Sequence, residues 1–368
     1  MRANKILGLI FSNTYDQYLS ELTSLRSMGS VPFGGRYRLI DFQLSAMVNS
    51  GIGKVGVITK SNYQSLMDHV GNGRSWDLAR KNGGLYILPP FNSTGSTGPY
   101  NNKIQALAGA ADFLRHSEEE YVLMTDCNTV YNVDLTEMFD FHNSKKADIT
   151  VAYATGKKPN IDELVSFELD GNGRITSAFK GRDDGAYSLN VVLMRKSLLE
   201  RLLNEAVSLN YTSFADDIIT RNVNSLKIYG YEFGGFVRVL DSLQSYFDTT
   251  MELLEKDNRK ALLSGRPVYT KVKDDVPAIY GLNSSVSNSL IAGGCVIEGE
   301  VENSVIFRGV HIGKGAVVKN CVLMQNTYIS DNVSINCVVS DKNAVIKPNK
   351  VLSGDAKYPL HIGKGIVI

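Results

Sequence analysis

The first two thirds of the chain alternate short apolar runs with stretches that are apolar on one side only. The apolar runs predict buried strands, and the amphipathic stretches predict helices that cover a mostly parallel sheet. The expected strands are Lys5–Ile10, Lys54–Thr59, Tyr121–Met124, Asp148–Tyr153, Tyr187–Met194 and Leu226–Phe233. The expected helices are Gln43–Asn49, Gln64–His69, Ile104–His116 and Leu243–Lys256.

From about Pro277 the helical pattern disappears, and small or aliphatic residues recur at every sixth position with Gly or Asn between them. This period predicts a parallel β-helix, in which each turn has three faces and the repeating residue points inward. An antiparallel sandwich would show a period of two without the sixfold repeat. The series are Val310-Ala316-Val322, Ile312-Val318-Met324 and Thr327-Val333-Val339-Val345-Val351.

These patterns predict an α/β protein of two domains, as the length of 368 residues also suggests. We expect residues 1–258 to form an α/β domain with a Rossmann-like, mostly parallel sheet. Residues 259–277 are the expected linker. Residues 278–368 are expected to form a left-handed parallel β-helix of hexapeptide repeats.

Composition excludes several classes of partner. The 39 Lys and Arg residues balance 38 Asp and Glu residues, so the net charge of +1 predicts no general attraction to nucleic acid. No apolar stretch approaches about 18 residues and no signal sequence precedes the first strand, which predicts a cytoplasmic protein without a membrane span. The widely spaced Cys127, Cys295, Cys321 and Cys337 are expected to be buried free thiols.

Five strings resemble bacterial glucose-1-phosphate adenylyltransferase, also called ADP-glucose pyrophosphorylase. They are Val31–Phe42, Asn49–Ile52, Trp76–Leu78, Ile87–Pro90 and Ser245–Phe247, and the resemblance covers essentially the whole chain. It implies an N-terminal nucleotidyltransferase domain and a reaction of ATP with glucose 1-phosphate that gives ADP-glucose and pyrophosphate for glycogen synthesis. Cations and backbone amides must stabilise the charge that develops on the phosphate oxygens in such a reaction.

The family's glycine-rich loop after the first strand is changed in this sequence. An ungapped alignment places its three glycines on Asn13, Thr14 and Asp16, its arginine on Tyr18 and its lysine on Met28. Glycine lets backbone N–H groups approach phosphate closely, whereas Asp16 puts a negative charge where a polyanion would lie. We therefore predict that this loop does not hold ATP.

The metal-binding aspartates that the resemblance implies are also changed. One falls on Asn128, which is uncharged, and the other on Val239, which has no donor atom. We expect no metal or other cofactor on this chain, with Mg²⁺ held by a catalytic partner. Asp126 and Asp241 each lie two residues from a lost position, and an alternative interpretation places a rearranged metal site on them.

The sugar-binding residues that the resemblance implies are only partly kept. Ser188 matches a family serine, and either Lys180 or Arg182 occupies the position of a glucose-phosphate lysine. These cations could equally be solvated loop residues.

A well-matched string carries Arg36 and Arg38, and the resemblance implies that a basic residue at position 36 binds anionic effectors such as sugar phosphates. His69 and Arg74 lie in a nearby segment and could complete such a pocket. The alternative is that the arginines pair with local carboxylates such as Asp41.

The sequence lacks the glycine-rich loop and the metal-binding aspartates of the family but keeps the strings that define its fold. This combination predicts a regulatory, catalytically impaired subunit, most like the GlgD-type subunits of this family. Its expected partner is a catalytic glucose-1-phosphate adenylyltransferase, in a heterotetramer or, alternatively, a homo-oligomer. One alternative is an active adenylyltransferase that uses Asp126 and Asp241. A second is a hexapeptide acyltransferase, for which His311 and His361 are the candidate catalytic histidines.

Overall fold

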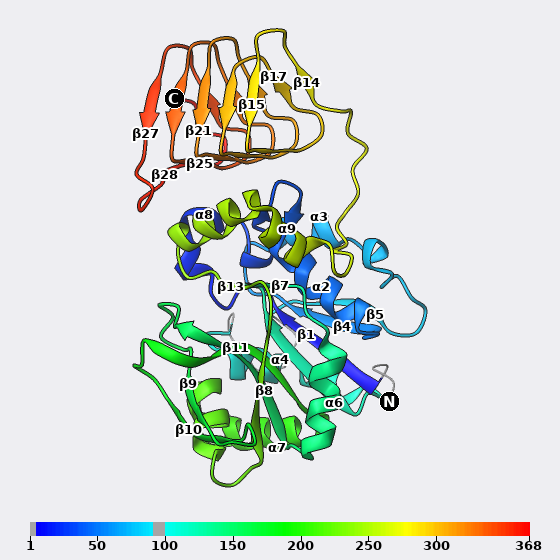
Figure 1. The fold of residues 1–368 in the computed structure, drawn as a ribbon. Helices are drawn as coiled ribbons and strands as arrows, with labels where there is room; N and C mark the ends of the chain where they lie inside the picture. Colours follow the sequence, from blue (N-terminus) through cyan, green and yellow to red (C-terminus); the bar gives the residue numbers. More distant parts are fainter. Residues whose placement is uncertain (1–4, 91–99) are drawn as a thin grey trace.

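The computed structural model describes residues 5–90 and 100–368. A nine-stranded sheet lies at the centre of the first domain (Figure 1), formed by β1 Ile6–Phe11, β4 Lys54–Ile58, β5 Gly84–Leu88, β6 Tyr121–Asp126, β8 Ile149–Lys157, β9 Ser166–Leu169, β10 Ile175–Phe179, β11 Asp184–Arg195 and β12 Ile228–Glu232. The strand order is β10-β9-β11-β6-β1-β4-β5, and β8 pairs with β11 and β12. Strands β1, β4, β5 and β6 are parallel, whereas β11 is antiparallel to its neighbours.

Both faces of this sheet are covered. Along β1, Ile6 and Ile10 pack in one apolar cluster while Leu7 and Leu9 pack in another on the opposite face. This explains why β1 is a continuous apolar run rather than an alternating one.

The helices are α1 Ser20–Thr23, α2 Leu39–Asn49, α3 Gln64–Val70, α4 Lys103–Gly109, α5 Ala111–Arg115, α6 Leu135–Lys145, α7 Lys196–Ser208, α8 Leu243–Met251 and α9 Lys256–Leu263.

The structure confirms all six expected strands, with shifts of a few residues at their ends, and the expected helices at α2 and α3. The helix expected over Ile104–His116 is interrupted at Ala110 and forms α4 and α5. The helix expected over Leu243–Lys256 ends as α8, and a 3₁₀ turn, η7 Glu252–Leu254, separates it from α9. Helices α6 and α7 were not among the expected elements.

The second domain consists of three parallel five-stranded sheets that stack turn on turn, which confirms the β-helix (Figure 1). The first sheet contains β14 Ile279–Tyr280, β17 Val296–Ile297, β20 His311–Ile312, β23 Tyr328–Ile329 and β26 Val345–Ile346. The second contains β15 Ser285–Ser287, β18 Glu300–Glu302, β21 Val317–Lys319, β24 Ser334–Asn336 and β27 Val351–Ser353. The third contains β16 Leu290–Ile291, β19 Val305–Ile306, β22 Val322–Leu323, β25 Val338–Ser340 and β28 Leu360–Ile362.

Corners of the β-helix adopt the left-handed backbone conformation, which Gly and Asn tolerate best. One column of corners contains Gly309, Asn326 and Asn343, all with positive φ. A Cβ atom on Gly309 would lie 2.5 Å from Oδ1 of Asn326 in the next turn, so this corner also needs glycine for space. The expected Gly and Asn corners are therefore confirmed.

The third sheet of the β-helix packs against the first domain, and this changes one part of the sixfold prediction. Val310 and Ala316 point into the β-helix core as expected, but Val322 and Val339 pack in the apolar cluster of the first domain. The periodicity does not distinguish these two buried faces. Val351 was expected to point inward, but its side chain is 76% exposed, and Leu352 packs against the β-helix core instead.

A buried ion pair and a fastened connecting segment join the domains. Nη2 of Arg26 lies 2.9 Å from Asp341 of the β-helix, and both side chains are almost fully buried. The segment between α9 and β14 is held by the first domain, since Lys271 donates to the carbonyl of Asp68 and Arg266 pairs with Asp134. Within residues 5–90 and 100–368, no helix is long and apolar enough to cross a membrane.

Candidate functional site

The loop that follows β1 is closed by its own side chains. Asn13 is buried, and its Nδ2 donates to Oδ2 of Asp16 at 2.7 Å while its Oδ1 accepts from the backbone N–H of Lys60 at 3.0 Å. Oδ1 of Asp16 accepts from the backbone N–H of Met28 at 2.8 Å. Two backbone donors beside the loop are therefore already used by side chains that replace family glycines.

Burial raises the pKa of Asp16 to about 7, although the hydrogen bonds from Asn13 and Met28 oppose this rise. A carboxyl group that titrates near neutrality inside this loop disfavours a bound polyanion once it ionises. The structure thus gives a local reason for the predicted failure of the loop to hold ATP.

Two tyrosines of the same loop bond to β11 and to the segment between β8 and β9, and the region that these contacts enclose beside Asp126 is called the cleft below. The hydroxyl of Tyr15 accepts from Nδ2 of Asn190 at 2.6 Å, and the hydroxyl of Tyr18 accepts from the backbone N–H of Asp162 at 3.1 Å. Asn190 stands on a family glycine and has a φ of 56°, so the left-handed conformation is retained with an asparagine. The alignment placed Asn190 on that glycine without giving it a binding role, and Tyr15 was not singled out from the sequence.

Asp126 forms a buried ion pair that the sequence did not indicate. Nζ of Lys103, the first residue of α4, lies 2.6 Å from Oδ2 of Asp126, and the ammonium lies 4.8 Å from the ring centroid of Phe11. Burial raises the pKa of Asp126, and the Lys103 ammonium and the Thr14 hydroxyl oppose this rise. A lysine at a helix N-terminus interacts unfavourably with the helix dipole. This unfavourable position of Lys103 was the sequence signal that could have pointed to an acidic partner.

The two lost metal positions lie next to each other in space. β7 (Thr129–Tyr131) pairs antiparallel with β13 (Val237–Val239), so that Val239 faces Thr129, and the N–H of Leu240 donates to the carbonyl of Asn128 at 2.7 Å. This proximity supports the alignment that identified Asn128 and Val239. Their side chains nevertheless do not fit Mg²⁺, because neither carries a negative charge and Val239 offers no oxygen.

Asp241 has a local role. Its Oδ2 accepts from the backbone N–H of Asn160 at 2.7 Å, and its Oδ1 accepts from the Ser242 hydroxyl at 2.9 Å. No group of three or more His, Cys, Asp or Glu side chains is arranged to hold a metal ion in the described part of the chain.

The sugar-side residues separate into two environments. Nζ of Lys180 lies 2.6 Å from Oδ2 of Asp216. Burial raises the pKa of Tyr18, and the charge of Lys180 is among the causes that oppose this rise, so Lys180 lies near the loop that follows β1. Arg182 instead stacks on the ring of Phe179 and lies 3.6 Å from Glu168. Ser188 is buried, and its hydroxyl accepts from the backbone N–H of Asn190 at 3.0 Å.

Glu163 and Asp216 are further cleft residues that sequence reasoning missed. Burial raises the pKa of Glu163, and the charges of Lys103 and Lys180 oppose this rise. Neither acid lies in a string that resembles the family strings quoted above, so no sequence signal pointed to them.

A basic pocket lies between the first domain, the connecting segment and the β-helix. It is a cavity of about 580 Å³ that includes Arg36, Arg38 and His69, three of the four predicted effector residues. Arg74 is exposed at the start of η4 (Arg74–Trp76) and lies outside the described lining. Sequence reasoning missed the other cations of this pocket, Lys271, Lys273, Arg308 and Lys342.

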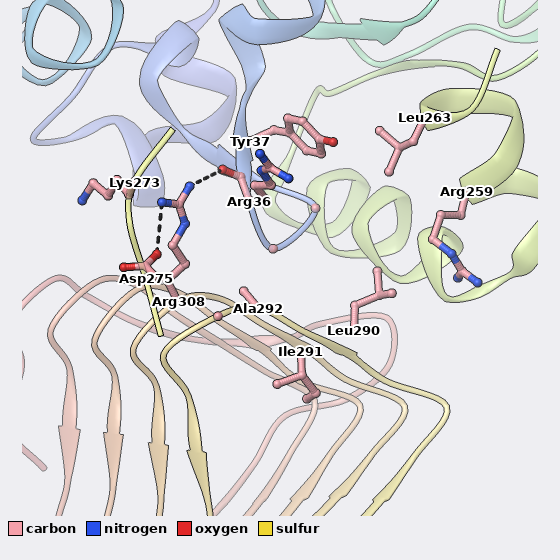
Figure 2. Close-up of a pocket in the computed structure, with 13 residues that line it drawn as sticks. Arg36, Tyr37, Arg259, Leu263, Lys273, Asp275, Leu290, Ile291, Ala292 and Arg308 are labelled. Carbon is pink, nitrogen blue, oxygen red and sulfur yellow. Dashed lines mark hydrogen bonds and ion pairs between the residues drawn. The ribbon is translucent and has the colours of Figure 1, made fainter. Parts of the chain in front are cut away.

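An adjoining cavity of about 480 Å³ shares Arg36, Lys273 and Arg308 with the basic pocket (Figure 2). There Nη1 of Arg308 lies 3.2 Å from Asp275, and its Nη2 points towards the carbonyl oxygen of Arg36. The two domains therefore contribute cations to one continuous region.

Asp41 does not neutralise the two arginines. Its Oδ1 lies 2.6 Å from Nε2 of His69, and its Oδ2 accepts from the backbone N–H of Arg38. The Arg38 guanidinium instead donates to Ser65, and burial lowers the Arg38 pKa to about 10. Burial and the neighbouring Arg38 and Arg26 lower the pKa of Lys342 to about 7.

The two candidate acyltransferase histidines lie on different sheets. His311 stacks on Tyr328 with ring centroids 4.4 Å apart on the first sheet, whereas His361 lies in β28 of the third sheet, near Glu21. This separation gives no shared catalytic site.

Comparisons with known proteins agree with the two-domain architecture. A nucleotidyl transferase family profile matches residues 8–179, and a GlmU-like C-terminal hexapeptide profile matches residues 276–359. The chain is 35% identical to glycogen biosynthesis protein GlgD of Bacillus subtilis (strain 168) and 39% identical to GlgD of Geobacillus stearothermophilus, each over 99% of this chain and 97% of the relative. It is 32% identical to glucose-1-phosphate adenylyltransferase of Clostridium perfringens (strain SM101 / Type A) over 89% of this chain and 87% of that enzyme. The chain therefore belongs to the glucose-1-phosphate adenylyltransferase family and matches its GlgD glycogen biosynthesis proteins over almost its whole length.

Proposed function

We propose that this chain is a regulatory, catalytically impaired subunit that acts in glycogen biosynthesis by assembling with a catalytic glucose-1-phosphate adenylyltransferase. The near full-length similarity to two GlgD proteins supports the pathway and the subunit type. The similarity to the adenylyltransferases supports a catalytic homologue as the partner, because related chains often pair through equivalent surfaces.

The single observation that carries the impaired-catalysis part is the Lys103–Asp126 ion pair beside the lost metal positions. The Lys103 ammonium pairs with the Asp126 carboxylate, which a rearranged metal site would need. The Asp241 carboxylate is held by hydrogen bonds from Asn160 and Ser242. These contacts weigh against the alternative of an active enzyme that uses Asp126 and Asp241. We accordingly propose that this chain binds no catalytic metal and that Mg²⁺ acts on the partner.

The basic pocket supports a binding role that the cleft no longer supports. Lysine and arginine side chains from both domains line it, and such a surface suits phosphate groups. We propose that an anionic effector such as a sugar phosphate binds there through Arg36, Arg38 and Lys342. Binding between the domains would link the effector to their arrangement, and hence to the partner.

The assembly test uses the complete chain with and without the catalytic homologue. Pyrophosphate release from ATP and glucose 1-phosphate should be near background for this chain alone. Mixing should change the maximal rate or the effector response of the catalytic chain, and native mass measurement should give a heterotetramer. Identical kinetics with and without this chain would contradict the proposal, as would tight Mg-ATP binding to this chain by calorimetry.

A repair series tests the catalytic defect. The variant Asn128→Asp with Val239→Asp should stay near background, because each contact still missing at the loop removes about 3 kcal/mol of transition-state stabilisation. Adding Tyr18→Arg, Met28→Lys and glycines at positions 13, 14 and 16 should recover more turnover than the pair of aspartates. High activity from the two aspartates alone would show that ATP already binds productively.

A further inference from the structure

A third cavity at the domain interface has a different chemistry from the basic pocket. It has a volume of about 680 Å³ and lies between the start of α8 and the segment that connects β27 to β28. Figure 1 places that segment beside α8, at the end of the β-helix opposite β14. The lining residues that matter here are Glu21, Leu243, Gln244, Asp355, Tyr358 and His361.

Two buried polar atoms of the lining lack partners. Nε2 of Gln244 donates to the carbonyl of Ala356 and to Asp248, both at 2.8 Å, but its Oε1 has no hydrogen-bond partner among the described residues. Nε2 of His361 is likewise buried without a partner in that part of the chain. An unsatisfied buried polar atom costs about 1–3 kcal/mol, so both atoms call for a hydrogen-bonding ligand.

The charge of this cavity does not suit a phosphate. Glu21 and Asp355 are its carboxyl side chains, and its described lining includes no lysine or arginine. Burial lowers the pKa of His361, so its imidazole is neutral at neutral pH and can both donate and accept. The cavity therefore suits an uncharged ligand rich in hydroxyl groups.

Tyr358 supplies a flat apolar surface at the mouth of the cavity. Its side chain is 83% exposed, yet its backbone is fixed by two hydrogen bonds with Asp355, at 3.0 and 3.1 Å. Pro359 and Leu360 extend the apolar surface. An aromatic face beside planar amide, carboxylate and imidazole groups matches a sugar ring, which has apolar C–H faces and a rim of hydroxyl groups.

We propose that this cavity binds a neutral oligosaccharide. Its ring would stack on Tyr358, and its hydroxyl groups would bond to Gln244, His361 and the two carboxylates. The cavity volume lies within the usual range of small-molecule sites. This role is separate from assembly with a catalytic partner and from the anionic effector.

The test measures binding of maltotriose to the complete chain by calorimetry and by saturation-transfer NMR. Binding in the millimolar range is expected for the parent chain. Tyr358→Ala should weaken it by at least about tenfold, which is about 1.4 kcal/mol, and His361→Ala should weaken it similarly. The matched control is Tyr280→Ala, which removes a tyrosine that is 52% exposed at the other end of the β-helix and should leave binding unchanged.

Thermal unfolding of each variant separates a lost site from a lost fold, and Tyr358→Ala should unfold at the parent temperature. If the parent chain does not bind maltotriose even at a concentration of about 10 mM, the proposal is overturned. Equal binding by the parent and Tyr358→Ala would also overturn it. So would displacement of maltotriose by inorganic phosphate or by ethanolamine, because the site would then recognise charge.

Discussion

The cleft beside β1 and the basic pocket between the domains treat charge in opposite ways. In the cleft, several ionisable side chains have partners within the chain, as Asp126 has Lys103, Asp16 has Asn13, and Lys180 has Asp216. Oδ1 of Asn128 is buried there without a hydrogen-bond partner in the described part of the chain. The pocket lining contains the cations Arg36, Arg38, Lys271, Lys273, Arg308 and Lys342 but only three carboxylates, Asp68, Asp274 and Asp275. Asp41 and Asp341 lie close enough to favour the charges of Arg38 and Lys342.

This difference separates a region whose charges are mostly paired within the chain from one with an excess of cations. Separating a buried ion pair leaves an uncompensated charge, so a ligand that broke these contacts would have to overcome that cost. Cations gathered with too few carboxylates repel one another until an anion binds. The comparison supports the proposal that side chains of this chain fill the cleft, while the basic pocket keeps an excess of cations.

The largest effect is expected from Lys103→Met, which removes the ammonium that pairs with Asp126 in the cleft. It leaves the Asp126 carboxylate buried without a counter-charge, and the free energy of unfolding should fall by about 3–5 kcal/mol. Urea unfolding at neutral pH measures this loss. Adding Asp126→Asn to the same chain should restore most of the lost free energy of unfolding. If Lys103→Met alone stays within about 1 kcal/mol of the parent, the cleft is not held by this ion pair.

A smaller effect is expected from the titration of Asp16. Its pKa is raised to about 7 in the folded chain, whereas an unfolded aspartate titrates near about 3.9. The folded state therefore holds the proton more tightly, and stability should decline as the pH rises from about 5 through 7, by about 3 kcal/mol in total.

The control for this prediction is Asp16→Asn, which removes the ionisable group. Unfolding by urea at a series of pH values should give a shallower slope for this variant than for the parent. Equal slopes would assign the pH dependence to other groups, such as His69 and Lys342.

On the pocket side, sulfate serves as an anion that does not itself titrate near neutrality. The pKa of Lys342 is about 7, so its ammonium is lost as the pH rises through that value. Sulfate affinity should fall by about tenfold between about pH 6 and pH 8, which corresponds to about 1.4 kcal/mol. Calorimetry should show proton uptake on binding near pH 7.

Arg26, Arg38 and Lys364 all oppose the charge of Lys342, and Asp341 favours it. A Lys342→Met variant should bind sulfate more weakly at pH 6 and with little pH dependence. A parent chain whose affinity does not change with pH would contradict the role of Lys342.

The smallest effect is expected from Arg74→Ala, which sharpens the boundary of the pocket. Arg74 lies outside the described lining, so sulfate affinity should stay within about twofold of the parent, well under 1 kcal/mol. Arg36→Ala should weaken sulfate several-fold in the same titration. An Arg74→Ala effect as large as that of Arg36→Ala would contradict the position of the pocket.

The sequence predicted elements better than the contacts between them. Buried strands and the six-residue period are local patterns, and both were recovered. The break at Ala110 was missed because Ile104–His116 is amphipathic throughout, and only the structure separates α4 from α5.

The candidate sites followed the same rule. Positions such as Asn128 and Val239 were identified by alignment and lie together, whereas Lys103 and Asp126 are joined by folding alone. The basic pocket draws Lys342 from the last turns of the β-helix, far along the chain from Arg36. No local pattern encodes such a meeting of distant residues.

The apolar face between the third sheet and the first domain bears on the order in which the chain is made. Val305, Val322 and Val339 complete an apolar cluster whose other members begin at Ile6, and Arg26 finds its partner only at Asp341. A ribosome delivers the N-terminal residues first. The first domain therefore leaves the ribosome with part of its apolar surface uncovered, and Arg26 gains its partner only after a further 315 residues have been made.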